Sequence, residues 1–115
     1  MIDFTPSLVK ALNTILPTHY ELKLSSGTKM PCISYQERSN AAQEQGETLG
    51  YSRISYTVKV WGTDLEQLNN YAKQIDNVLR PLGWKRTGAQ ELHSYQTATI
   101  QKIMTYECLA LETFE

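Results

Sequence analysis

The stretch YSRISYTVKVW, from Tyr51 to Trp61, has the most regular pattern in the chain and decides the predicted fold. Apolar side chains occupy every second position from Ile54 to Val60, and polar side chains fill the positions between them. Because successive side chains of a β-strand point to opposite faces, this alternation predicts a long strand with one face against a core. Gly62 ends the pattern, and we expect the stretch to be the central strand of a sheet.

A helix is predicted directly after this strand. Thr63 and Glu66 have the spacing of a capping box, in which the two side chains satisfy the first free amides of a helix. Apolar residues then recur every three or four positions, at Leu65, Leu68, Ala72, Ile75, Leu79 and Leu82. This stripe is typical of a helix that packs one face on a core, and Pro81 and Gly83 predict its end.

The region before the central strand predicts one helix and two strands. Thr5 and Pro6 suit the start of a helix, and an apolar stripe follows over residues 8–16. Residues 20–24 and 31–36 alternate between apolar and polar side chains, which predicts two short strands.

Residues 37–50 are expected to form a long flexible loop, because Leu49 is their only large aliphatic side chain. Glu37, Glu44 and Glu47 lie in this segment and raise the possibility of a carboxylate site for acid–base chemistry or calcium. Their spacing does not match a calcium-binding loop, so we expect a solvated acidic loop instead.

The C-terminal region predicts two strands, over residues 84–91 and 100–112, with a turn at 93–96. The second is apolar on both faces, so it is either central in the sheet or paired to something outside the monomer. The order is α-β-β-β-α-β-β. It predicts an α+β fold: an antiparallel sheet of four to five strands with two helices on one face, in a single domain spanning 1–115.

Composition excludes several classes of function. Eleven basic and twelve acidic side chains give a formal net charge of −1, which argues against binding to nucleic acid. No apolar run approaches the ~20 residues of a membrane span, and residues 1–4 do not resemble a secretion signal, so we expect synthesis in the cytoplasm and no membrane partner. Cys32 and Cys108 are too few for a disulfide scaffold.

No set of residues predicts catalysis. The chain has neither a nucleophile with a base and an orienting group nor a glycine-rich phosphate loop, so we expect a protein that is not an enzyme. His19, His93, Cys32 and Cys108 could form a zinc site in principle, but zinc ligands normally come in closely spaced pairs and these do not. We therefore expect no metal and no cofactor.

Charged and aromatic residues provide weaker signals. Arg80, Lys85 and Arg86 form a basic cluster that either contacts an acidic partner or simply complements the end of the second helix, where Asp76 and Arg80 have the spacing of an ion pair. Several aromatic residues near the ends of predicted elements are candidates for an interface or for ordinary packing: Tyr51, Trp61, Trp84 and Tyr95.

Three segments together resemble a known family. They are Met30-Pro31-Cys32-Ile33-Ser34-Tyr35, the long strand that ends in Trp61-Gly62, and the helix that runs from Asp64 to Leu79 before a glycine and a final pair of strands. This arrangement is similar to that of the small tail terminator and tail completion proteins of bacteriophages with long tails. The resemblance covers nearly the whole chain and consists of hydrophobic patterns rather than catalytic motifs.

The resemblance implies a structural virion protein, made in the host cytoplasm, that forms a ring of usually six copies at the head-proximal end of the tail. Its partners would be further copies of itself, the tail tube protein and the head connector, and it would stop polymerisation of the tube and join the tail to the head. An extended loop or hairpin reaches neighbouring subunits in such proteins, and residues 37–50 and 88–97 occupy the corresponding places here.

The residues expected at subunit or tube contacts are Arg38, Glu44, Glu47, Tyr51, Arg53, Lys59, Trp61, His93 and Tyr95. The alternative is a small regulatory or ligand-binding α+β domain that dimerises through its sheet.

Overall fold

The computed structural model describes residues 5–20, 29–45, 49–94 and 98–113, and the side chains of these except 39–52 and 110–113. In chain order the elements are α1 (Thr5–Asn13), β1 (Thr18–Tyr20), β2 (Cys32–Gln45), β3 (Leu49–Gly62), α2 (Leu65–Leu79), a short 3-10 helix η2 (Arg80–Leu82), β4 (Lys85–Ser94) and β5 (Thr99–Thr113).

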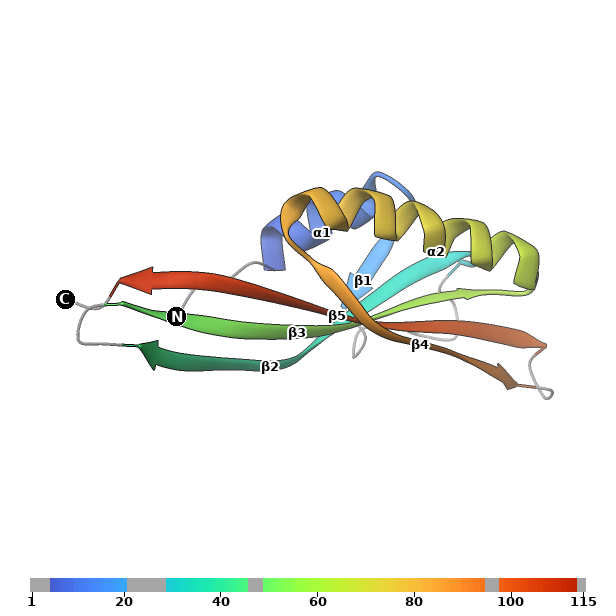
Figure 1. Cartoon of the computed structure of the whole chain (residues 1–115). Coiled ribbons are helices and arrows are strands. Elements are labelled where there is room, and N and C mark those ends of the chain that lie inside the picture. Colours follow the sequence, from blue (N-terminus) through green and yellow to red (C-terminus); the bar gives the residue numbers. More distant parts are fainter. Residues whose placement is uncertain (1–4, 21–28, 46–48, 95–97, 114–115) are drawn as a thin grey trace.

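The five strands form one sheet in the order β1-β2-β3-β5-β4, and both helices lie on the same face of it (Figure 1). The α+β fold and its order of elements are therefore confirmed. One pairing differs from the predicted antiparallel sheet, because β1 runs parallel to β2. Parallel neighbours need a longer connection than a tight hairpin, and β1 and β2 are well separated in the sequence. Of the strand predicted over residues 20–24, Tyr20 is the last residue of β1, and residues 21–24 lie outside the described part of the chain.

The core lies between the sheet and the helices, where the predicted stripes meet. On β3 the alternate residues Ile54, Val58 and Val60 have no exposed surface, and Tyr56 retains 1%. They pack beneath the apolar faces of both helices, which contribute Leu8, Leu12, Leu68, Ala72, Ile75 and Leu79. The alternation of the long strand and the stripes of both helices are thus confirmed.

The helix boundaries depart from the prediction in detail. α1 ends at Asn13 rather than Leu16. The residue that caps α2 is Asp64, not Thr63: its backbone is extended, and its carboxylate accepts a hydrogen bond of 3.1 Å from the backbone N–H of Glu66. A capping residue has an extended backbone, and its side chain accepts from a free amide two or three residues further along the chain. Asp64 fulfils both conditions, so the helix is capped one residue later than predicted.

The segment predicted as a flexible loop is mostly β-strand, so that prediction is wrong for residues 37–45 and 49–50. β2 continues to Gln45 and pairs along its length with β3, ending in the pair Gln45↔Leu49. Backbone hydrogen bonds stabilise this strand although its residues carry few apolar side chains. Because every residue has the same backbone groups, amino-acid composition does not predict such pairing. Residues 46–48 lie outside the described part of the chain.

β2, β3 and β5 run together past the helices as a three-stranded extension (Figure 1). We call it the arm and define it as residues 41–45, 49–53 and 109–113, which pair in register across the three strands. The arm makes the molecule elongated, with extents of 53 × 25 × 22 Å.

At the other end of the molecule, β4 is an exposed edge strand that pairs with β5. β4 includes His93 and Ser94, which were predicted to lie in a turn, and residues 95–97 are not described. β5 lies between β3 and β4. The expectation that a strand with two apolar faces is central in the sheet is therefore confirmed for the part of β5 that pairs with both neighbours. Neither helix found in the described ranges has the length and apolar character needed to cross a membrane.

Candidate interaction site

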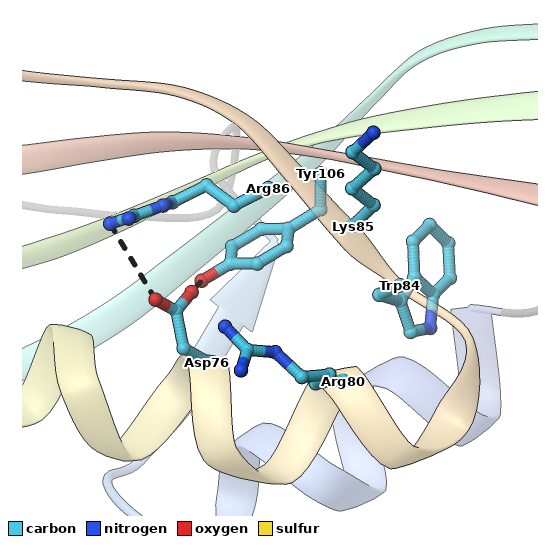
Figure 2. A pocket seen from close by; sticks show the side chains of 6 residues that line it. All are labelled: Asp76, Arg80, Trp84, Lys85, Arg86 and Tyr106. Carbon is cyan, nitrogen blue, oxygen red and sulfur yellow. Dashed lines mark hydrogen bonds and ion pairs between the residues drawn. The ribbon is translucent and has the colours of Figure 1, made fainter.

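A hollow of about 350 Å³ lies where the C-terminal half of α2 meets β4 and β5 (Figure 2). Its lining gathers charged and aromatic side chains from all three elements: Asp76, Arg80, Trp84, Lys85, Arg86 and Tyr106. The three cations predicted as a basic cluster thus lie in one hollow, together with a single carboxylate.

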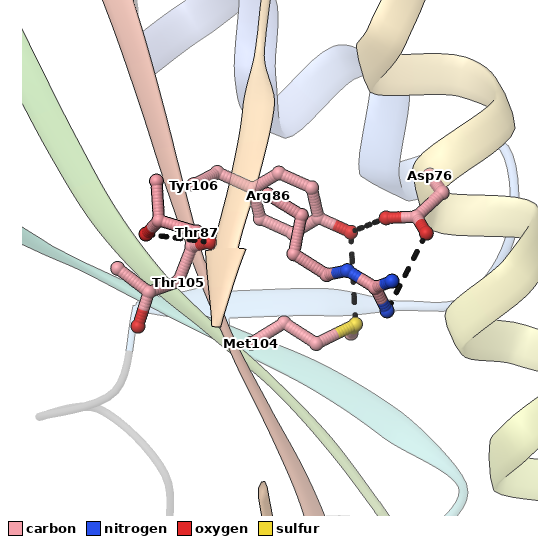
Figure 3. A network of polar contacts seen from close by, with 6 residues as sticks. All are labelled: Asp76, Arg86, Thr87, Met104, Thr105 and Tyr106. Carbon is pink, nitrogen blue, oxygen red and sulfur yellow. Dashed lines mark hydrogen bonds and ion pairs between the residues drawn. The ribbon is translucent and has the colours of Figure 1, made fainter. Parts of the chain in front are cut away.

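The centre of the hollow is a polar network that the sequence did not predict (Figure 3). Tyr106 is 1% exposed and donates a hydrogen bond to the Asp76 carboxylate, and the Met104 sulfur lies 3.6 Å from the same hydroxyl. Arg86 pairs with Tyr106 across the β4–β5 ladder, which brings its Nη1 to 3.5 Å from Asp76 Oδ2.

The register of β4 positions Arg86 for this contact. A shift in register between Arg86 and Gly88 leaves Thr87 as the extra residue, whose hydroxyl donates to the Thr105 carbonyl at 3.4 Å. Such a bulge bends the strand and redirects its side chains. Asp76 was expected to pair with Arg80 four residues along the helix, but its carboxylate contacts Arg86 and Tyr106 instead.

The Tyr106 hydroxyl acts as a donor and not as a base. Burial raises its pKa far above the usual value, and the hydrogen bond to Asp76 and the negative charge of that carboxylate raise it further. A tyrosine in this state stays protonated over the physiological range. The network therefore joins α2 to β4 and β5 and offers no nucleophile.

A second network fixes the base of the arm. The buried Tyr56 hydroxyl donates to Glu37 Oε2 at 3.0 Å and accepts from the Thr5 hydroxyl. The Tyr56 ring meets the Trp84 ring edge-on, with 5.5 Å between their centroids. Glu37, which was considered for a calcium or catalytic site, is thus a structural acceptor, and Trp84 packs in the core at 4% exposure.

A second hollow of about 380 Å³ adjoins the first and extends the charged surface toward the arm. Its lining combines Arg53, Gly83, Lys85, Glu107, Cys108 and Leu109. Lys85 lines both hollows. Together the hollows are lined by four cations, Arg53, Arg80, Lys85 and Arg86, and by the carboxylates Asp76 and Glu107. Arg53 and Glu107 alternate along their strands with the core residues Ile54 and Tyr106, so they belong to the face of the sheet opposite the helices.

The residues expected at subunit contacts fall into three separate places. Glu44, Tyr51 and Arg53 lie on the strands of the arm, and exposed Arg38 comes shortly before it on β2. Arg53 lines the second hollow, and the side chains of Glu44 and Tyr51 lie outside the described part of the structure. Glu47 and Tyr95 lie outside the described residues.

Lys59 and Trp61 lie together on the face of the sheet opposite the helices. Trp61 Nε1 donates to Ser34 Oγ at 2.9 Å, and Lys59 Nζ lies 5.9 Å from the centroid of the Trp61 ring. This is a cation–π distance, so the ring is held from two sides. Both residues retain exposed surface on this uncovered face, so their expected contact with another subunit stays a prediction.

His93 lies far from the arm, on the exposed β4–β5 pair, with its Nε2 3.7 Å from Glu91 Oε2. Lys102 donates to Glu91 at 3.0 Å, and this hydrogen bond is the main cause of a lowered Glu91 pKa. The group is a cross-strand charge cluster of the kind that stabilises exposed strand pairs.

The four residues considered for zinc do not assemble. His19 and His93 lie on the strands at opposite edges of the sheet. Among the side chains that the structure describes, those of residues 5–20, 29–38, 53–94 and 98–109, no three from histidine, cysteine, aspartate or glutamate lie close enough together to hold a metal ion. Cys32 and Cys108 are buried, and burial raises the pKa of both thiols, which makes them weak nucleophiles.

The chain was also compared with known proteins. No protein-family model matches it, and no curated protein matches it either.

Proposed function

We propose that the chain is a structural protein of a long-tailed bacteriophage. It assembles into a ring at the head-proximal end of the tail, stops polymerisation of the tail tube and joins the tail to the head connector. The observation that carries the proposal is the arm, a paired three-stranded extension that projects beyond the helices.

The arm suits a subunit of a ring in two respects. Residues 37–50 occupy the place where the resemblance predicts a hairpin that reaches neighbouring subunits, and β2 and β3 pair there as far as Gln45 and Leu49. A ring contact is heterologous, so each subunit needs two different contact surfaces. The arm offers an edge of β2 on one side and an edge of β5 on the other.

The side chains support a role in assembly rather than chemistry. The hollow beside α2 holds a protonated tyrosine, a carboxylate that is already paired, and cations, which form no set of nucleophile, base and orienting group. Its lining is mostly charged, whereas sites for small molecules are usually lined by apolar side chains. This favours a protein partner over the ligand-binding alternative.

The test is the mass of the purified protein by light scattering, alone and after mixing with a phage tail tube protein. We expect a species of about six times the 13.1 kDa chain mass, either alone or on the tube. A stable dimer that ignores the tube protein would overturn the proposal and favour the regulatory domain.

A shortened arm makes the test specific. Ala41 and Arg53 are directly paired, so replacing residues 42–52 by Asn-Gly should close the hairpin with a two-residue turn. We expect this variant to keep the cooperative unfolding of its core, followed by circular dichroism, but to lose ring formation. The matched control, Gln74→Ala on the exposed side of α2, should assemble normally. Normal assembly of the shortened variant would contradict a role for the arm.

A further inference from the structure

The arm has two open edges. β4 pairs with β5 only as far as Glu107, and β1 pairs with β2 only from Ile33 to Tyr35. Residues 108–113 of β5 therefore have no neighbouring strand on their outer side among the strands in the described ranges. The same is true of residues 36–45 of β2 on the opposite side of the sheet. Each edge presents backbone N–H and C=O groups that can pair with another strand.

The two edges run in the same direction. β2 and β5 are both antiparallel to β3 and lie on either side of it, so both run toward the tip of the arm (Figure 1). When two copies stand side by side with their arms pointing the same way, the β5 edge of one lies along the β2 edge of the next in parallel orientation. A two-fold dimer would instead pair like edges in antiparallel orientation.

Both edges lack most of the features that protect an exposed strand, although Glu44 on β2 and Glu112 on β5 place one charged residue in each arm segment. Lysine and proline, which block pairing at edges, are missing from the sequence of residues 36–45 and 108–113. The β5 segment Cys-Leu-Ala-Leu-Glu-Thr is apolar over most of its length, and Leu109 is 60% exposed. The shift in register between Glu37 and Ser39 lies before the arm and leaves residues 41–45 in regular pairing.

We propose that copies of the chain join by parallel pairing of the β5 edge (residues 109–113) of one copy with the β2 edge (residues 41–45) of the next. The arms then form one continuous closed sheet with three strands from each copy. The occupant of each edge is a second copy, because the two edges are different and run in the same direction, so that one can pair with the other in a heterologous contact. This inference rests on the proposed ring and specifies the contact that builds it.

Disulfide trapping tests the contact. Ala42 and Ala110 both pair with Ser52, so within one chain they lie two strand spacings apart, about 9–10 Å. That is too far for a disulfide, so a bond between cysteines at these positions reports a contact between copies. The native Cys32 and Cys108 are buried and react slowly, so they can remain.

The double variant Ala42→Cys/Ala110→Cys is oxidised under the conditions in which the protein assembles and is run on a denaturing gel. We expect a ladder of linked chains that ends at the size of the ring, whereas each single variant stays monomeric on the gel. The experiment is repeated with cysteine at 41 or 43 in place of 42, which covers neighbouring registers. Gln74→Cys/Ala110→Cys is the control and should give no ladder.

The outcomes separate the inference from the proposed function. A ring by light scattering without a ladder in any register would overturn the edge pairing and leave the ring standing. Linked dimers in the single variants would show two-fold pairing of like edges and overturn both. A protein that stays monomeric alone and with the tube protein would also overturn both.

Discussion

Replacing Tyr106 by Phe should destabilise the protein through the loss of one hydroxyl. The ring is 1% exposed, and its hydroxyl donates to Asp76, whose side chain is 18% exposed and also faces Arg86. A hydrogen bond to a charged group contributes about 1.5–3 kcal/mol to the free energy of unfolding. With a urea dependence of about 2 kcal/mol per molar, we expect the midpoint of unfolding to fall by about 1 M.

The same variant should change how stability depends on pH. Burial and Asp76 raise the pKa of Tyr106 in the folded state above the unfolded value of about 10. A raised folded pKa means that the contribution of the hydroxyl is complete below pH ~10 and is lost as the pH rises above it. We therefore expect the difference in stability between the wild type and Tyr106→Phe to shrink above pH ~10, by up to about 1.4 kcal/mol per pH unit.

Urea unfolding at pH 7, 9 and 10.5, followed by circular dichroism, measures both effects. Tyr20→Phe is the matched control, because Tyr20 is 36% exposed. The loss of its hydroxyl should lower the free energy of unfolding by less than about 0.5 kcal/mol. A Tyr106→Phe midpoint equal to that of the wild type, or a stability difference that stays constant above pH 10, would refute the role assigned to the network.

Three further changes test local features of the fold. Asp64→Ala removes the cap of α2 and should cost about 1 kcal/mol in urea unfolding; a neutral result would mean that the cap bond does not form in solution. Gly62→Ala places a Cβ 2.9 Å from Leu68 Cδ2 in the core and should cost about 1–3 kcal/mol, seen as a lower Tm, whereas an unchanged Tm would show that the core yields there. Lys102→Met removes the donor to Glu91, so the pKa of that carboxyl should rise toward its ordinary value in an NMR titration; no change would mean that Lys102 is not the cause.

The sequence predicted those elements in which buried and exposed side chains recur at the regular spacing of a strand or a helix. The alternation from Ile54 to Val60 and the stripe from Leu68 to Leu79 record which side of each element faces the core. The arm was not predicted because pairing between β2 and β3 uses backbone groups that every residue carries. A polar stretch such as residues 37–45 then forms a strand when a neighbouring strand provides the partners for its backbone hydrogen bonds.

The candidate site was predicted only in part. Arg80 and Lys85 are close in the sequence, so their cluster was visible before the structure. Asp76 and Tyr106 are 30 positions apart in the sequence, with all of β4 between them, and meet only because β5 passes beneath α2. The available signal was Asp76, an acidic residue that directly follows the buried residue Ile75. A carboxylate close to the core costs free energy unless another group compensates its charge.

The sheet separates the two tryptophans of the chain, and this gives each face its own optical reporter. Trp84 is 4% exposed and packs against Tyr56 on the helix side, whereas Trp61 is partly exposed on the opposite side and bonded to Ser34. A soluble quencher should therefore reduce the fluorescence of Trp61 far more than that of Trp84 in the folded chain. Binding of a partner over the uncovered face would protect Trp61 alone, so the emission of the native protein distinguishes docking from unfolding without any attached dye.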